Sequence, residues 1–308
     1  MRIVSLLPSA TEFVYALGLE DMLVGVSADC DYPPQVREKP VVSVSTLPQA
    51  AVEKGLDAAA IDRAVAEKVA RGEPLYRVKE ETVRELRPDL ILAQDLCRVC
   101  AVPSGHVTDA LEMLGVSSEV LSLDPHSVTE VVDCGRRVAE AAGRPQAGRL
   151  LADDLQRRLD NVAARARDTA PVRMLALEWP DPPFSAGHWV PEMIRVAGAE
   201  DVLGRPGMPS RRVTWEDVRR SKPDKVVYMP CGYSLPEASE QLGKLVAGGL
   251  LDPVPAAGTG EIYAVDASSY FSRPGPRMVD GVEILAWIAD PAAHPEPPPG
   301  RVSRVGAR

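Results

Sequence analysis

The sequence predicts an α/β protein of two doubly wound lobes, each built on a mostly parallel sheet, with one long helix joining them. Three observations support this fold class. Short apolar runs of strand length alternate with helical patterns in both halves of the chain, which is typical of βα units. One long amphipathic helical pattern separates the halves. At 308 residues the chain is also long enough to form two hydrophobic cores.

The first lobe is predicted over residues 1–126. Its first βα unit is a strand at residues 3–7, followed by a helix in which Ser9 and Glu12 have the spacing of a capping box. Gly18 stands where that helix is expected to end. Further strands are predicted at 23–26, 41–44, 89–93 and 120–123, and helices at 61–70, 80–86 and 107–114.

A helical segment over residues 127–168 follows, and it is interrupted once, at Gly143-Arg144-Pro145. Its second piece, residues 146–167, carries leucines at helical spacing, among them Leu151, Leu155 and Leu159. At 1.5 Å per residue this helix is roughly 30 Å long. We interpret it as a stiff connection between two lobes; the alternative is a helix packed inside a single domain.

The second lobe is predicted over residues 169–290, where the alternation of strands and helices resumes. Strands are predicted at 173–178, 225–229 and 262–265, and helices at 191–197 and 277–289. The remaining residues, 291–308, are rich in Pro, Ala and Gly, and we expect a disordered tail.

The composition excludes several classes of partner. A net charge of -9 argues against nucleic acid, because phosphate binding needs a basic surface. No apolar run reaches the roughly 18 residues that a membrane span requires, so no membrane insertion is predicted. No secretory signal precedes the strand that starts at Ile3, which favours a cytoplasmic protein; removal of a signal would instead place it in the periplasm or outside the cell.

The candidate ligand site follows from the fold, because open α/β sheets bind ligands beyond the carboxyl ends of their strands. The residues predicted to bind ligand there are Pro8, Ser9, Asp31, Tyr32, Trp179, Phe184, His188, Trp189, Tyr233, Tyr270 and Arg273. They come from both lobes, so the prediction requires that these loops share one cleft.

The most informative of these loops is the segment EWPDPPFSAGHW at residues 178–189. Its proline-stiffened aromatic side chains present flat surfaces at low entropic cost, which suits a large planar or macrocyclic ligand. The alternative is that Trp179 and Trp189 cover the core of the second lobe. His188 is a candidate axial metal ligand or a hydrogen-bonding wall residue, and Arg273 is a candidate partner for a carboxylate or phosphate.

Four cysteines, Cys30, Cys97, Cys100 and Cys231, each follow a predicted strand. Four thiolates that converge on a cleft are the composition of a zinc or iron–sulfur site, and a reducing cytosol favours metal binding over disulfides. The alternatives are buried thiols or a redox pair at Cys97 and Cys100. The fifth cysteine, Cys134, lies in a predicted helix and is expected to be a small buried hydrophobe.

Several motifs resemble a known family. The opening RIVSLLPSATE at residues 2–12, followed by Leu17-Gly18, resembles the substrate-binding proteins of importers for cobalamin and ferric siderophores. Within that family the resemblance is to the proteins described as cobalamin-binding, through CDYPP at 30–34, LCRVCAV at 96–102, GHWVP at 187–191 and SRPGPR at 272–277. The resemblance covers about residues 1–290. It implies a fold like that of class III periplasmic binding proteins, delivery of ligand to a membrane importer, and no catalysis.

The function predicted on these grounds is the binding of a corrinoid, such as cobalamin, or of another metal chelate between the lobes. The alternative is a cytosolic metalloprotein with a cysteine-bound zinc ion or iron–sulfur cluster in the cleft. An enzyme is not expected, because the sequence contains no nucleophile elbow, no phosphate-cradling glycine loop and no paired-histidine motif.

Overall fold

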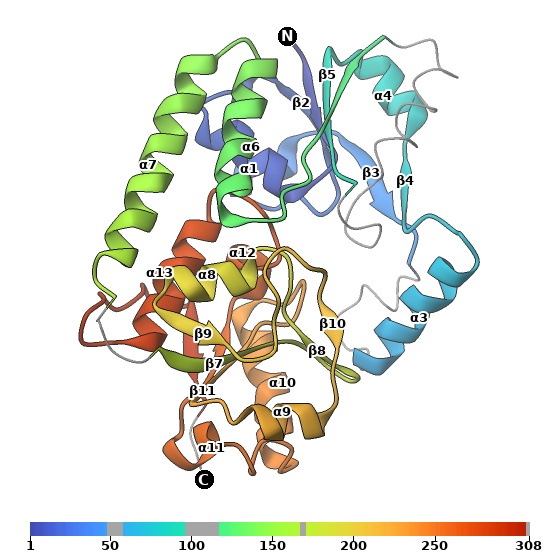
Figure 1. Cartoon of the computed structure of the whole chain (residues 1–308). Helices are drawn as coiled ribbons and strands as arrows, with labels where there is room; N and C mark the ends of the chain where they lie inside the picture. The colour runs from blue at the N-terminus through green and yellow to red at the C-terminus, as the bar shows by residue number, and fades with distance from the viewer. Residues whose placement is uncertain (48–57, 96–116, 167–170, 306–308) are drawn as a thin grey trace. The chain divides into compact units, whose positions relative to one another are not determined.

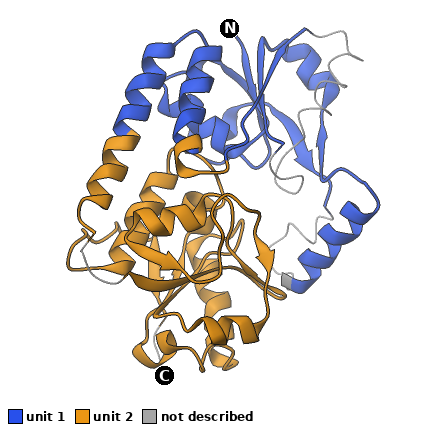
Figure 2. Cartoon of the chain, in the orientation of Figure 1, with its two compact units in different colours: residues 1–125, 131–154 blue, residues 126–130, 155–308 orange. Residues whose placement is uncertain are grey.

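The computed structural model describes residues 1–47, 58–95, 117–166 and 171–305 (Figure 1). Contacts within the chain divide it into two compact units (Figure 2). Unit 1 consists of Met1–Pro125 and Val131–Asp154, and unit 2 consists of His126–Glu130 and Leu155–Arg308. Within the described ranges, no helix combines the length and the apolar character needed to cross a membrane.

Unit 1 is built on a six-stranded sheet with the order β4-β3-β2-β1-β5-β6. The strands are β1 (Ile3–Ser5), β2 (Leu23–Ser27), β3 (Val41–Ser45), β4 (Tyr76–Val78), β5 (Leu90–Ala93) and β6 (Glu119–Ser122). All neighbouring pairs are parallel except β3 and β4. The chain therefore winds outward from β1 in both directions, as expected for a doubly wound lobe.

The helices of unit 1 mostly lie where the sequence predicts them. They are α1 (Pro8–Ala16), α3 (Ala58–Ala70), α4 (Glu80–Leu86), α6 (Val128–Ala141), which enters the unit at Val131, and the first part of α7 (Pro145–Ala163), together with the 3-10 helices Glu20–Met22 and Pro34–Glu38. The helix predicted at 107–114 lies outside the described residues. The predicted capping box is wrong, because α1 starts one residue before Ser9. Leu7 is the N-cap, and Pro8, which has no N–H group to satisfy, opens the first turn.

Unit 2 contains a seven-stranded sheet with the order β10-β8-β7-β11-β12-β13, in which β9 also pairs with β7. The strands are β7 (Val172–Pro180), β8 (Pro183–Ser185), β9 (Ala199–Asp201), β10 (Arg211–Arg212), β11 (Lys225–Tyr228), β12 (Ile262–Val265) and β13 (Val302–Arg304). The pairs β7–β11, β11–β12 and β7–β9 are parallel, whereas β7–β8, β8–β10 and β12–β13 are antiparallel. The expectation of a mostly parallel sheet is thus met in unit 1, while the sheet of unit 2 is mixed.

The other helices of unit 2 in the described range pack with this sheet and its loops. They are α8 (Val190–Val196), α9 (Trp215–Ser221), α10 (Leu235–Ala247), α11 (Pro255–Thr259), α12 (Ala267–Tyr270) and α13 (Met278–Ala289). The core beneath α9 and α10 includes Leu175, Leu177, Val226 and Leu242, all of which are fully buried. This core holds β7 and β11 firmly, and their carboxyl ends carry the candidate site.

The expectation of a disordered tail is wrong for its last described residues. β13 pairs antiparallel with β12, and the Arg304 guanidinium donates to the Gly260 carbonyl at 2.7 Å and forms an ion pair with Glu261. An uncovered β12 would leave a row of unpaired backbone groups at the edge of the sheet. Pairing with that edge orders the tail despite its Pro- and Gly-rich composition.

The second part of α7 is tied to α13 within unit 2. The Arg158 guanidinium donates to both carboxylate oxygens of Glu283, at 3.0 and 2.8 Å, and to Asp280 at 3.1 Å. Arg301 donates to the same Asp280 oxygen at 2.9 Å. Because the Arg158 side chain is only 27% exposed, solvent screens this network less than it screens an ordinary surface pair.

We expect Arg158→Met to lower the free energy of unfolding by about 1–2 kcal/mol, since it removes a two-pronged, partly buried carboxylate contact. The matched control is Lys244→Met, which removes an ion pair to Glu240 with both side chains more than 70% exposed. That change is expected to cost less than about 0.5 kcal/mol. Urea denaturation followed by tryptophan fluorescence measures both values, and equal losses would rule out a special role for Arg158.

Candidate functional site

In unit 2, the segments that follow β7, β11 and β12 lie at one edge of the sheet. The Cys231 amide after β11 donates to the Glu178 carbonyl at the end of β7, at 3.4 Å. The Ser268 amide after β12 donates to the Tyr233 carbonyl at 3.0 Å. The three carboxyl ends are therefore linked to one another, which is the arrangement from which open α/β sheets bind their ligands.

Three of the predicted aromatic residues come together at this edge, and we call Trp179, Phe184 and Tyr233 the aromatic group. The Trp179 and Tyr233 rings meet edge to face, with their centroids 5.7 Å apart. Trp179 pairs with Phe184 across the β7–β8 hairpin, which places both side chains on one face. The Arg212 guanidinium lies 5.7 Å from the centre of the Phe184 ring.

Trp179 has a further property that suits a ligand contact. Its side chain is only partly buried, yet the indole Nε1 is buried and has no hydrogen-bond partner among the residues that the structure describes. A buried indole N–H normally finds a partner, because leaving it unsatisfied costs free energy. Trp179 thus combines an accessible apolar surface with an unused donor.

Trp189 differs from Trp179 in both respects. Its side chain is 6% exposed, and its Nε1 donates to the Phe271 carbonyl at 2.9 Å. The structure therefore gives Trp189 the core position that the sequence left open as the alternative. The predicted contact between Trp189 and a ligand receives no support from this geometry.

His188 has a constrained backbone. Its φ of 53° lies in the left-handed region, which is uncommon for residues other than glycine. The conformation is held from both sides, because the His188 amide donates to the Met208 carbonyl at 2.6 Å and the Gly207 amide donates to the His188 carbonyl at 2.9 Å. Such local strain persists only where the surrounding structure enforces it.

The surroundings of the His188 imidazole favour its neutral form. Burial is the main cause that lowers the pKa of His188, and the nearby His126, whose ring centre is 6.4 Å away, adds to the effect. The Nδ1 atom of His188 is buried without a hydrogen-bond partner in the described part of the chain. The sequence gives no sign that His126 belongs beside His188, because the two lie far apart in the chain and meet only in the folded unit.

Tyr270 and Arg273 follow β12. Two guanidinium groups lie near the Tyr270 ring, Arg277 at 5.7 Å and Arg301 at 5.1 Å from the ring centre. Burial is the leading cause that raises the pKa of Tyr270, so the phenol stays protonated at neutral pH. Arg273 is partly buried in the turn before α13, and its carbonyl accepts from the Gly275 amide at 2.8 Å.

The other predicted ligand-binding residues belong to unit 1. Pro8 opens α1, and the adjacent Ser9 is 3% exposed. Asp31 is partly buried, and Tyr32, which follows β2, is 45% exposed. Tyr32 thus offers an accessible ring, whereas Ser9 is part of the helix packing. That these residues share one cleft with those of unit 2 stays a prediction.

The predicted cysteine site is divided between the units and the undescribed residues. Cys30 belongs to unit 1, where it is 5% exposed and its sulfur lies 3.1 Å from the Thr11 hydroxyl oxygen. Cys231 belongs to unit 2 and is exposed. Cys97 and Cys100 lie outside the described residues. Among the residues that are described, no three His, Cys, Asp or Glu side chains are grouped to hold a metal ion. Cys134 is buried in α6, as expected.

The sequence of the chain is similar to those of two curated proteins. The chain is 26% identical to the vitamin B12-binding protein of Vibrio cholerae over 290 residues, which cover 92% of this chain and 86% of the relative. It is 25% identical to the vitamin B12-binding protein of Pectobacterium atrosepticum over 289 residues, which cover 90% of this chain and 84% of the relative.

Similarity to crystal structures confirms the fold. The periplasmic vitamin B12-binding protein BtuF of Vibrio cholerae matches with a TM-score of 0.66 at 23% identity, covering 94% of this chain and 97% of that one. A periplasmic heme-binding protein from Pseudomonas aeruginosa matches with a TM-score of 0.71 at 22% identity, covering 99% of both chains. The predicted architecture of two α/β lobes, the class III periplasmic binding protein fold, is therefore right.

A family model decides the membership. The model described as periplasmic binding protein matches residues 3–268, which include most of the described strands and helices of both units. Proteins of this family bind small ligands for transport and are not enzymes. The chain belongs to the periplasmic binding protein family.

Proposed function

We propose that the protein binds a metal-centred tetrapyrrole, with a corrinoid such as cobalamin as the first candidate, and delivers it to a membrane importer. The observation that carries the proposal is the aromatic group of unit 2, which meets at the carboxyl edge of its sheet. Aromatic side chains cover large planar ligands with little loss of conformational entropy. The relatives named as vitamin B12-binding proteins support a corrinoid over other ligands of this kind.

Heme is the second candidate, because its planar ring would suit the same aromatic surface and because several similar structures are named as heme-binding proteins. A zinc or iron–sulfur site is not part of the proposal. Cys30 is buried against Thr11, and the described residues contain no group suited to a metal ion.

The test is a titration of the purified protein with cyanocobalamin and, separately, with hemin, followed by calorimetry and absorption spectroscopy. Saturable binding of cyanocobalamin supports the proposal, and preferential binding of hemin would replace the corrinoid with heme. Failure to bind either compound would overturn the proposed function.

We expect Trp179→Ala to weaken binding of the preferred tetrapyrrole by about 10- to 100-fold, which is typical of a buried aromatic contact at an interface. The matched control is Trp287→Ala. Trp287 also lies in unit 2 and also meets a tyrosine edge to face, Tyr263 at 6.3 Å, but it belongs to α13 and not to the aromatic group. Equal losses of affinity in the two variants would show that Trp179 contributes only through stability.

Delivery to an importer and the cytosolic location predicted from the sequence exclude each other, and protease accessibility distinguishes them. The measurement is digestion of the protein in producing cells whose outer membrane has been permeabilised, with the inner membrane intact, and in fully lysed cells. Cleavage before the inner membrane is broken supports delivery from outside that membrane. Protection until full lysis would leave the ligand-binding proposal in place but would contradict the delivery role.

A further inference from the structure

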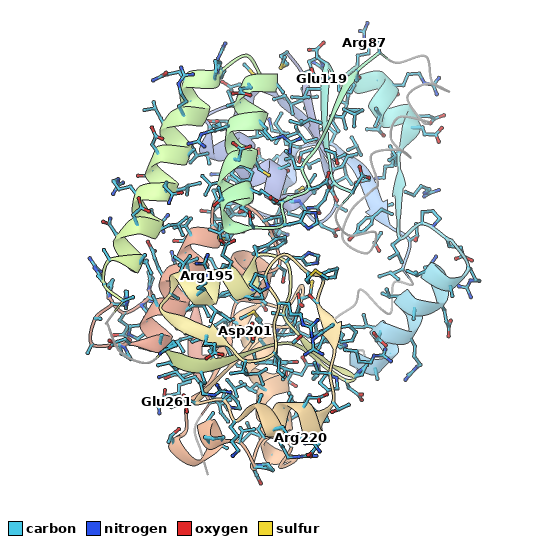
Figure 3. All side chains as sticks on the ribbon, in the orientation of Figure 1. Arg87, Glu119, Arg195, Asp201, Arg220 and Glu261 are labelled. Atoms are coloured by element: carbon cyan, nitrogen blue, oxygen red, sulfur yellow. The ribbon has the colours of Figure 1, made fainter. Side chains whose placement is uncertain are left out.

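Asp201 lies in unit 2 (Figure 3), outside the aromatic group. Its Oδ2 atom is buried, which is unusual for a carboxylate. Asp201 ends β9, where its Oδ1 accepts from the Leu203 amide at 3.0 Å and from the Gly204 amide at 2.7 Å. The buried Oδ2 has no hydrogen-bond partner among the described residues. Asp201 therefore fixes the turn that leaves β9.

The space around the Asp201 carboxyl group is closed on two sides. A Cβ atom added to Gly204 would lie 2.2 Å from Asp201 Oδ2 and 2.8 Å from the Cγ of Pro191 at the start of α8. The turn and the first residues of α8 thus enclose the carboxyl group. A change in the charge of this group therefore acts directly on the turn that carries the Leu203 and Gly204 amides.

The turn continues into a segment that holds His188. We call residues 202–210 the bracing loop; it runs from Asp201 to β10. The loop supplies both partners of the His188 backbone, the Met208 carbonyl at 2.6 Å and the Gly207 amide at 2.9 Å. A Cβ atom on Gly187 would lie 2.2 Å from the Ser210 nitrogen, so the contact between the loop and residues 187–188 is already as close as backbone atoms allow.

The charges around Asp201 are few. Burial is the largest influence, and it raises the pKa of Asp201 to about 6, with Glu200 of β9 acting in the same direction. The Gly204 and Leu203 amides and Arg211 of β10 act in the opposite direction. Arg211 also donates to the Leu203 carbonyl at 3.3 Å, so it too touches the bracing loop.

We propose that Asp201 is a positioning residue for ligand binding: its carboxylate fixes the bracing loop, and the loop holds the backbone of His188, one of the predicted ligand-binding residues. The proposal rests on the proposed function, in which unit 2 binds the tetrapyrrole. An ionised carboxylate forms stronger hydrogen bonds to the Leu203 and Gly204 amides than a protonated one does. The loop is therefore held most firmly above the pKa of Asp201, and ligand affinity falls when Asp201 is protonated.

The test compares the wild-type protein with Asp201→Asn, which keeps a carbonyl oxygen at the acceptor position but carries no charge at any pH. Dissociation constants for cyanocobalamin, or for hemin if it is the preferred ligand, are measured from pH 5 to pH 8. At pH 7.5 the variant is expected to bind about 3- to 10-fold more weakly, since the charge-assisted hydrogen bonds are lost. At pH 5 the two proteins are expected to converge, because wild-type Asp201 is then neutral as well.

Asp224→Asn is the matched control. Asp224 lies in the same unit and also accepts from a backbone amide, that of Arg173 at 3.1 Å, but this contact lies outside the bracing loop. Its substitution is expected to leave the pH dependence of binding unchanged. A constant ratio of the wild-type and Asp201→Asn dissociation constants across the pH range would overturn the proposal.

A second readout needs no ligand, so it separates this proposal from the proposed function. The backbone amide resonances of Gly204 and His188 are followed by NMR during a pH titration of the free protein. Both are expected to shift with one midpoint near pH 6 in the wild type, and Asp201→Asn is expected to remove that shared transition; a His188 shift that persists in the variant belongs to the imidazole of His188 itself. A transition at Gly204 without one at His188 would overturn the coupling between Asp201 and His188, even if the protein binds its ligand. A shared transition in a protein that binds neither compound would refute the proposed function but not this coupling.

Discussion

Gly187→Ala is expected to lower the free energy of unfolding by about 3 kcal/mol, the upper range for forcing an extra methyl group into a packed site. The added Cβ would lie 2.2 Å from the Ser210 nitrogen and 2.6 Å from the Met208 carbonyl oxygen, and both of these are backbone atoms. Backbone atoms cannot move out of the way by a change of rotamer, as the end of a flexible side chain can. Either the bracing loop or the β8–α8 turn must move, and the hydrogen bonds to His188 are broken.

The measurement is chemical denaturation, with Gly243→Ala as the matched control. Gly243 lies inside α10 of the same unit, and a Cβ there would meet no atom within 4 Å. Since alanine is the better helix former, the control is expected to be neutral or to gain up to about 1 kcal/mol. Gly187→Ala with wild-type stability would mean that the bracing loop is not in tight contact with residues 187–188.

Asp201→Asn is expected to stabilise the protein above pH 6. The pKa of Asp201 is about 6 in the folded protein against 3.8 as the ordinary value, so the folded state binds the proton more tightly than the unfolded state does. The free energy of unfolding therefore falls as the pH rises from about 4 to about 6, and the loss is complete above pH 6. At about 1.4 kcal/mol per pKa unit, the penalty is at most about 3 kcal/mol.

The measurement is the difference in unfolding free energy between the variant and the wild type at pH 4 and at pH 7.5. We expect a gain of about 1–3 kcal/mol at pH 7.5 and no difference at pH 4. Asp224→Asn again serves as the control and is expected to give no such gain. A variant that is less stable than the wild type at pH 7.5 would contradict the burial of an ionised Asp201.

Asp201→Asn is expected to raise the stability of the protein but to weaken ligand binding, and the same buried carboxylate explains both effects. The buried charge costs stability because it is removed from water, yet it strengthens the hydrogen bonds that fix the bracing loop. Groups that lower stability while serving a site are a common feature of functional regions. A variant that is more stable and binds more weakly would support both parts of this account.

Elements with a strong local pattern were predictable from the sequence. α4, α7, α13 and β12 lie within a few residues of the predicted ranges, because each carries a clear apolar period and defined end residues. α9 and α10 were missed, although Thr214 with Asp217 and Ser234 with Glu237 form capping boxes whose spacing was visible in the sequence. The short strands β8, β9, β10 and β13 have no such pattern, and pairing with a longer neighbour creates them.

The candidate site could be predicted only in part. Trp179, Phe184 and Tyr233 were recognisable as aromatic residues at the ends of strands, and the fold brings them together. Trp189 belongs to the same aromatic segment as Trp179 and looked equivalent to it. It is buried instead, because its indole N–H reaches the Phe271 carbonyl 82 residues away. Asp201 carried no signal, since an aspartate at the end of a strand is ordinarily a solvated turn residue.

The alternation of strands and helices, the long α7 and the family all followed from the amino-acid sequence, because they depend on local periodicity and short motifs. The folded structure was needed to show which tryptophan side chain is accessible to solvent, how the tail pairs with β12, and that one loop connects Asp201 with His188. Those outcomes depend on burial and on hydrogen bonds between residues far apart in the chain. Neither the burial of these side chains nor these long-range hydrogen bonds exist until the sheet has assembled.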